Sequence, residues 1–377
     1  MNAQRPLVVH VKSKEPKLNN AAFNQDQSCF AICTDTGFKV YSTYPMELKM
    51  ERDFSKGSFG IKETRDSSST TRNVNSGIGI VKMLYKTNYV ALVGGGKKPR
   101  SPLNKLCIWD DLKEKNSIVL EFNTPLLNIH LSRTHIVALL KNNALVYSFK
   151  SKPELLFSFE TDDNEPGASD LAICESSSIL VFPGRNNGQI HIVDIINTQD
   201  KKSVSLIKAH RNPVQCLALS PRGNLVASAS TKGTIIRIHD TKNCTLVYEF
   251  RRGVDPAIIS DMKFAPSGTK LAVLSDKCTL HIYHLGEENK KHLLKDLPLF
   301  PNYFKSTWSV MSKNVGNKSD LVNDIGTLGW VNDNVLVIVW KYKGIWEKYD
   351  IISNEMDSVS SEESRKWEIV KEGWRSV

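Results

Sequence analysis

Residues 225–240 have the sequence LVASASTKGTIIRIHD, which predicts a β-hairpin. Two short strand-like runs flank the turn Thr231-Lys232-Gly233, where glycine favours a tight reversal of the chain. The same strand–turn–strand pattern recurs along the chain at intervals of roughly 40 residues, a spacing typical of repeat proteins. We therefore expect a fold built from one repeated unit of short strands.

The chain of 377 residues contains about seven such units. They lie at residues 28–41, 89–110, 136–149, 179–194, 225–240, 271–284 and 335–349. An aspartate follows the third strand of several units (Asp110, Asp194 and Asp240), as in WD-type repeats. Long amphipathic helices are not evident. These features predict an all-β fold, a seven-bladed β-propeller of WD-repeat type, with residues 1–377 as a single domain.

Three segments interrupt the repeat and are predicted to be long loops, at about residues 53–79, 286–306 and 313–324. The stretch from Trp367 to Trp374 is expected to form a strand that helps to close the ring. Leu7 to Val11 is a second candidate for that strand, and the sequence does not choose between the two.

The overall composition restricts the class of partner. A formal net charge of +10 favours an anionic partner, and nucleic acid, a membrane surface and an acidic protein all qualify. No apolar run approaches the ~20 residues that span a bilayer, and we expect no secretory signal. The seven cysteines are scattered without a Cys-x-x-Cys pair, which favours reduced thiols over disulfides or a metal site.

Adjacent arginines occur in Phe250-Arg251-Arg252-Gly253. Neighbouring side chains of an extended segment point to opposite sides, so the two arginines can serve two separate anion pockets. The guanidinium group offers a planar fork of donors that suits phosphate. The alternative is an ordinary pair in which one arginine is solvated and the other forms a salt bridge.

Together with other segments, this motif resembles the PROPPIN family, the phosphoinositide-binding propellers that include the WIPI proteins. The segments that carry the resemblance are Ala91 to Gly96, Ala209-His210, Lys232 to Arg237, Phe250 to Gly253, Ser275 to Lys277 and Tyr303 to Ser309. The resemblance spans nearly the whole chain. It implies two lipid headgroup sites on the rim of blades 5 and 6, both recognising phosphatidylinositol 3-phosphate and phosphatidylinositol 3,5-bisphosphate.

The resemblance also implies which residues form each site. The first would use His210, Ser228, Ser230, Thr231, Arg237 and Arg251. The second would use Arg252, Ser275, Lys277, Thr279 and His281, with Ser260 as a further candidate. For His210 the alternative is a structural histidine in a buried hydrogen-bond network, as in ordinary WD-type repeats. Asp255 either weakens phosphate binding at the second site or orients Arg252.

A peripheral membrane protein usually needs a second anchor beside a headgroup site. The candidates are the apolar residues of one loop: Leu293, Leu294, Leu297 and Leu299. His210 and His281 are expected to tighten lipid binding as the pH falls through ~6.5, if their pKa values are unperturbed.

The resemblance implies an effector or scaffold in autophagy and in endosomal and vacuolar traffic, cytoplasmic and peripherally bound to those membranes. We expect a protein partner from autophagy or membrane traffic, a monomer, no cofactor and no metal. The first alternative is a WD-type scaffold for protein–protein interactions without lipid binding. Nucleic-acid binding is disfavoured because the basic region lacks aromatic stacking residues. Catalytic motifs are not found, and Gly94-Gly95-Gly96-Lys97-Lys98 lacks the spacing of a phosphate-binding loop.

Overall fold

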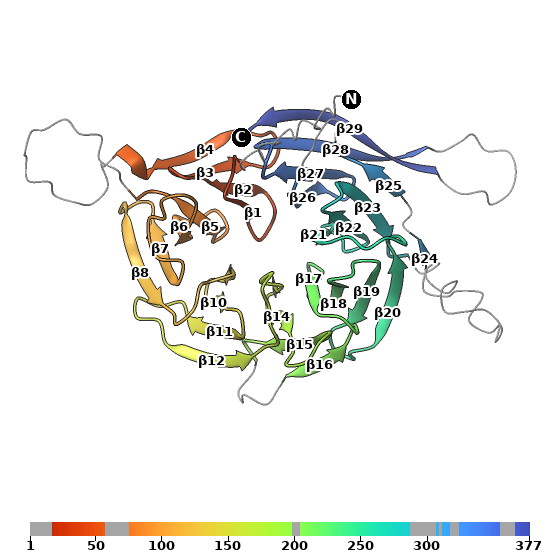
Figure 1. Ribbon diagram of the computed structural model, residues 1–377, viewed down its shortest axis with the longest axis horizontal. Coiled ribbons are helices and arrows are strands. Elements are labelled where there is room, and N and C mark those ends of the chain that lie inside the picture. The colour runs from red at the N-terminus through yellow and green to blue at the C-terminus, as the bar shows by residue number, and fades with distance from the viewer. Residues whose placement is uncertain are drawn as a thin grey trace, which may run out of the picture.

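The computed structural model describes residues 17–56, 75–197, 204–286, 307–308, 311–316, 324–354 and 366–377. Within them the strands form seven sheets that stand side by side in a ring around a central channel (Figure 1). The predicted seven-bladed β-propeller is thereby confirmed. No helix of the described residues is long and apolar enough to cross a membrane. Leu7 to Val11 and the four leucines of the proposed insertion loop lie outside the described residues.

We number the sheets as blades 1 to 7 in chain order, with the first strand of each innermost. Blade 1 consists of β1 (Asn20–Phe23), β2 (Cys29–Cys33), β3 (Gly37–Ser42) and β4 (Leu48–Asp53). Blade 2 consists of β5 (Ile78–Met83), β6 (Tyr89–Gly94), β7 (Lys105–Asp110) and β8 (Lys115–Glu121). Blade 3 consists of β9 (Asn128–Leu131), β10 (His135–Leu139), β11 (Asn143–Ser148) and β12 (Leu155–Glu160). A short 3-10 helix, η1 (Phe54–Lys56), follows β4.

Blades 4 to 7 consist of β13 (Asp170–Ile173), β14 (Ser178–Pro183), β15 (Gln189–Asp194) and β16 (Ser205–Lys208); β17 (Val214–Leu219), β18 (Leu225–Ser230), β19 (Ile235–Asp240) and β20 (Leu246–Arg251); β21 (Ile259–Phe264), β22 (Lys270–Ser275), β23 (Thr279–His284) and β25 (Met311–Asn314); and β26 (Gly326–Asn332), β27 (Val335–Trp340), β28 (Ile345–Asn354) and β29 (Lys366–Ser376). The two-residue strand β24 (Thr307–Trp308) pairs in parallel with β20 and adds a fifth strand to blade 5.

The seven predicted hairpins are the two middle strands of the seven blades. These strands were recognisable because neighbouring blades cover both of their faces, so β2 and β10 are buried along their whole length. The outer strands are mostly exposed, as in β4 and β8, and their mixed sequences carry a weaker signal. Two predicted loops were too long, because Lys313 belongs to β25, and Asp53 and Ile78 belong to β4 and β5.

The core consists of seven hydrophobic clusters, one at each interface between neighbouring blades. In β27, Val337 and Val339 pack toward blade 1, whereas Leu336, Ile338 and Trp340 pack toward blade 6. This division follows from the alternation of side chains along a strand. Most middle strands therefore contribute to two clusters at once; β19 contributes to one, because Arg237 and His239 lie on its other face.

The ring closes between blades 7 and 1 through side-chain packing. Trp367 to Trp374 forms part of β29, which is the outer strand of blade 7 and pairs with β28. In the described part of the chain, blade 1 is built from residues 20–53 alone. Leu18 donates a backbone hydrogen bond of 3.1 Å to Lys341 and packs into the cluster that joins the two blades.

We expect Ile338→Ala to destabilise the propeller by about 2–5 kcal/mol, because it removes a fully buried side chain from the interface of blades 6 and 7. Chemical denaturation would measure the change in the free energy of unfolding. Ile352→Ala in the same blade is the matched control, since Ile352 is 44% exposed and should cost little. Equal losses for the two variants would contradict this account of the core.

Candidate headgroup-binding site

The arginine pair lies at the end of β20, the fourth strand of blade 5. Phe250 is buried against Tyr283 of blade 6, with ring centroids 4.6 Å apart. Because successive side chains alternate, Arg251 lies on the opposite face, toward blade 4, and Arg252 follows on the side of blade 6. The structure thus places the two arginines at different blade interfaces, and Arg251 is half-buried whereas Arg252 is buried.

A hydrogen-bond network occupies the interface of blades 4 and 5. His210 lies in the connection between the two blades, and its Nε2 is 2.9 Å from the Ser228 hydroxyl. That hydroxyl donates to the carbonyl of Arg237 over 3.3 Å. The Arg237 guanidinium donates from Nη1 to the Ala209 carbonyl over 2.5 Å and from Nε to Glu249 Oε2 over 2.8 Å. His210 therefore has the structural hydrogen bond that the alternative interpretation expected.

The remaining residues predicted for the first site lie on the hairpin of β18 and β19 and on the adjoining strand β20. Ser230 is buried at the end of β18, and Thr231 is exposed in the turn that follows. Arg251 pairs with Ile235 of β19, two positions along the strand from the Arg237–Glu249 pair. The structure therefore brings Ser228, Ser230, Arg237 and Arg251 onto one face of blade 5, with Thr231 in the adjoining turn. His210 faces them from the connection between blades 4 and 5.

A second group lies between blades 5 and 6. The Arg252 guanidinium donates from Nε to the Gly233 carbonyl over 2.7 Å and from Nη2 to the Asp255 carbonyl. On blade 6, Ser275 and Thr279 share a hydrogen bond of 2.6 Å between their hydroxyls. Thr279, His281 and Tyr283 alternate with buried apolar residues along β23 and so share its face toward blade 5. Lys277 is exposed in the turn between β22 and β23.

Ser260 is placed apart from this second group. It lies on β21, the innermost strand of blade 6, where it lines the central channel of about 900 Å³. Its hydroxyl donates to the Leu274 carbonyl over 3.2 Å. The register of the strands shifts between Ile259 and Asp261, so Ser260 is an additional residue in a β-bulge. A bulge interrupts the alternation, and a pattern of period two cannot locate it.

The two candidate histidines are neutral near physiological pH. Burial, together with a smaller contribution from the charge of Arg237, lowers the pKa of His210 to about 3. Burial also lowers the pKa of His281 to about 4, with a further contribution from Arg252. The expected tightening of lipid binding through ~6.5 is therefore not supported for the lipid-free protein. The rings can still accept or donate one hydrogen bond without a charge.

Sequence reasoning missed three neighbours of these groups. Glu249 contacts Arg237, His239 is buried on the same face of β19, and Tyr283 is buried beside His281 with its hydroxyl unpaired within the described residues. Alternation along the strands could have found all three, because each is two residues from a predicted site residue. Among the described residues, no group of three His, Cys, Asp or Glu side chains is arranged to hold a metal ion.

The glycine-rich segment is a loop between neighbouring strands. Gly94 ends β6, and the chain continues to β7 without a helix. The backbone N–H of Lys97 donates to Asp35 of blade 1 over 3.1 Å. This loop of blade 2 thus contacts blade 1 through a hydrogen bond.

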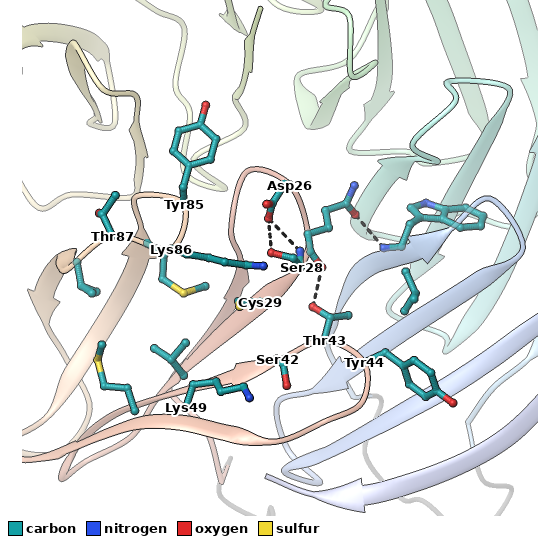
Figure 2. Close-up of a pocket in the computed structure, with 17 residues that line it drawn as sticks. Asp26, Ser28, Cys29, Ser42, Thr43, Tyr44, Lys49, Tyr85, Lys86 and Thr87 are labelled. Carbon is teal, nitrogen blue, oxygen red and sulfur yellow. Dashed lines mark hydrogen bonds between the residues drawn. The ribbon is translucent and has the colours of Figure 1, made fainter.

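A separate cleft of about 510 Å³ lies at the junction of blades 1 and 2 (Figure 2). Tyr44, Lys49, Tyr85 and Lys86 line it beside apolar residues of both blades. Trp330 and Val331 of blade 7 also line it, so blades 3 and 4 separate the cleft from the arginine pair on one side of the ring and blade 6 separates it on the other (Figure 1). The cleft and the two polar groups are thus independent features of the molecule.

We expect the free energy of unfolding to fall as the pH is lowered from 7.5 to 5. Burial lowers the pKa of His130 and His210 to about 3 and of His239 and His281 to about 4. Below ~6.5 the unfolded chain binds protons that the folded protein does not, and stability is lost. Thermal unfolding at pH 7.5, 6 and 5 would measure the effect. A constant Tm would contradict it, and His281→Gln should reduce the slope.

We expect Arg252→Ala to reduce stability more than Arg251→Ala does. Loss of the buried Arg252 guanidinium leaves two carbonyl oxygens without their donor, at a cost of about 1–3 kcal/mol. Arg251 is more exposed. Differential scanning fluorimetry of the single variants would test this, and an equal or larger loss for Arg251→Ala would contradict it.

The PROPPIN family model matches residues 17–293. The chain is 50% identical to SVP1-like protein 2 of Pichia angusta, over 100% of this chain and 99% of that protein. It is 34% identical to SVP1-like protein 2 of Saccharomyces cerevisiae, covering 100% of both. Among solved structures, Kluyveromyces lactis Hsv2 with its complete loop 6CD superposes with a TM-score of 0.75 at 28% identity, covering 96% of this chain and 99% of that one.

Proposed function

The chain belongs to the PROPPIN family of phosphoinositide-binding β-propellers, and from this premise we propose that it binds phosphatidylinositol 3-phosphate and phosphatidylinositol 3,5-bisphosphate. The two headgroup sites are those at the interfaces of blades 4 and 5 and of blades 5 and 6. The observation that carries the proposal is the division of Arg251 and Arg252 between the two faces of blade 5, each beside a group of hydroxyls and a histidine.

The first site consists of His210, Ser228, Ser230, Thr231, Arg237 and Arg251. The second consists of Arg252, Ser275, Lys277, Thr279 and His281; Ser260 faces the channel and contributes less directly. Arginine supplies charge and bidentate geometry toward phosphate, and serine and threonine supply neutral donors. The neutral histidines take part through hydrogen bonds. Two weak sites on one rigid body strengthen each other through effective concentration on the membrane.

In this proposal the protein is a peripheral effector or scaffold on autophagic, endosomal and vacuolar membranes, without catalytic activity. It acts as a monomer and recruits a protein partner of autophagy or membrane traffic. Leu293, Leu294, Leu297 and Leu299 form the second membrane anchor. β24, later in the chain, pairs with β20 at Phe250 and Arg251.

Liposome flotation tests the proposal. Replacing Arg251 or Arg252 alone by alanine should weaken binding to liposomes that contain phosphatidylinositol 3-phosphate, and replacing both should abolish it, because each arginine belongs to a different site. The double variant Lys113→Ala/Lys115→Ala, on the exposed turn of blade 2, is the control with the same change in charge. A folded arginine double variant that still floats would refute the assignment.

The cleft at blades 1 and 2 favours a second candidate function, a protein-interaction scaffold without lipid binding. Clefts lined by tyrosines and apolar side chains are suited to peptide recognition. Failure of the folded wild-type protein to float with either phosphoinositide would favour this alternative.

A further inference from the structure

Arg237 is the only residue of the first site for which the described contacts show an ion pair with a carboxylate. Its Nε lies 2.8 Å from Glu249 Oε2, and the two side chains are 26% and 28% exposed. The pair is thus accessible to a ligand from outside the ring. A phosphate that approaches this edge of the Arg237 guanidinium finds Nε already bound to the Glu249 carboxylate.

The strand register makes this contact a consequence of the fold. Arg237 of β19 and Glu249 of β20 are direct cross-strand partners, and side chains at such positions lie close enough to interact. Glu249 also shares its strand and its face with Arg251, two residues further along. The acidic side chain of Glu249 is therefore a neighbour of both Arg237 and Arg251 of the first site.

We propose that Glu249 competes with phosphate for Arg237 and so limits the affinity of the site between blades 4 and 5. The inference rests on the proposed function and deepens it. A bound headgroup displaces the Glu249 carboxylate from Arg237 Nε, and the displaced carboxylate stays nearby because β20 holds its backbone. Glu249 is a specificity-determining residue of this site, because its charge opposes each further phosphate brought close to the two arginines.

The ion pair between Arg237 and Glu249 is weak enough for a phosphate to displace. Partly exposed ion pairs stabilise a protein only weakly, so a phosphate with two negative charges can replace the carboxylate. Like charges held close together oppose binding even after the contact is broken. The second site differs, because the described hydrogen bonds of the Arg252 guanidinium go to the backbone carbonyls of Gly233 and Asp255. Among the described contacts the direct ion pair with a carboxylate therefore belongs to the first site, whereas at the second site the charges of Asp276 and Asp255 act on Arg252 without a described ion pair.

The test is a gain of function. Glu249→Gln keeps the shape and the hydrogen-bonding capacity of the side chain and removes its charge. Titration with liposomes containing phosphatidylinositol 3-phosphate, followed by sedimentation, should show binding tighter by roughly threefold to tenfold, the effect of about 1 kcal/mol. A parallel titration with soluble inositol 1,3-bisphosphate separates headgroup recognition from general attraction to the membrane, and should show the same gain.

Glu51→Gln is the matched control. Glu51 and Lys39 are cross-strand partners on the third and fourth strands of blade 1, and their charged atoms are 3.3 Å apart. The control thus removes one charge from the corresponding ion pair, away from both sites, and should leave affinity unchanged. The gain must also depend on the first site, so Glu249→Gln/Arg251→Ala should bind no tighter than Arg251→Ala.

The outcomes separate the inference from the proposed function. If the wild-type protein binds and Glu249→Gln binds equally well or more weakly, the inference is wrong; weaker binding would show that the carboxylate accepts hydroxyls of the inositol ring. An equal gain in Glu51→Gln would also overturn it. If the folded wild-type protein binds neither probe, the proposed function fails and the inference with it. Glu249→Ala, checked for an unchanged Tm, should reproduce the gain.

Discussion

The packing of each blade against its two neighbours is the constraint on which this structure depends. Most middle strands have apolar side chains on both faces, and the core forms seven clusters, one for each interface in the ring. Burial of apolar area is the main stabilising contribution in such a core. Because blade 7 packs on blade 1 through Val337, Val339 and Phe30, the ring closes without a shared strand in the described residues.

This constraint also determines where polar chemistry can lie. The middle of each interface is apolar, so polar residues collect at the strand ends, the turns and the connections between blades. Arg251 and Arg252 lie at the end of β20, whereas Arg237 lies within β19. Partly or fully buried, Arg237 and Arg252 both form hydrogen bonds with neighbouring residues. Arg252 shows the consequence, since the same guanidinium that is proposed to bind phosphate also connects two backbone segments. Binding and stability are therefore linked at this residue.

Sequence patterns predicted the parts of the molecule that are strongly periodic. The seven hairpins and the opposite placement of Arg251 and Arg252 follow from alternation along strands, and the structure has both. Ser260, a candidate from the family resemblance and not from alternation, sits in a bulge and lines the channel. The patterns failed where burial and long-range contacts matter. His210 and His281 were expected to titrate near ~6.5, but burial lowers the pKa of each well below that value.

The amino-acid sequence by itself was sufficient to predict the repeat, the class of fold and the residue types of the candidate sites, because these depend on local periodicity and on short motifs. Only the tertiary structure established which residues meet across strands, turns and blades. Glu249 contacts Arg237 through strand pairing, His210 reaches Ser228 from the preceding blade, and Arg252 is buried under the turn of its own blade. These contacts join residues that are separated in the chain, and their energies depend on burial and distance, which local sequence does not contain.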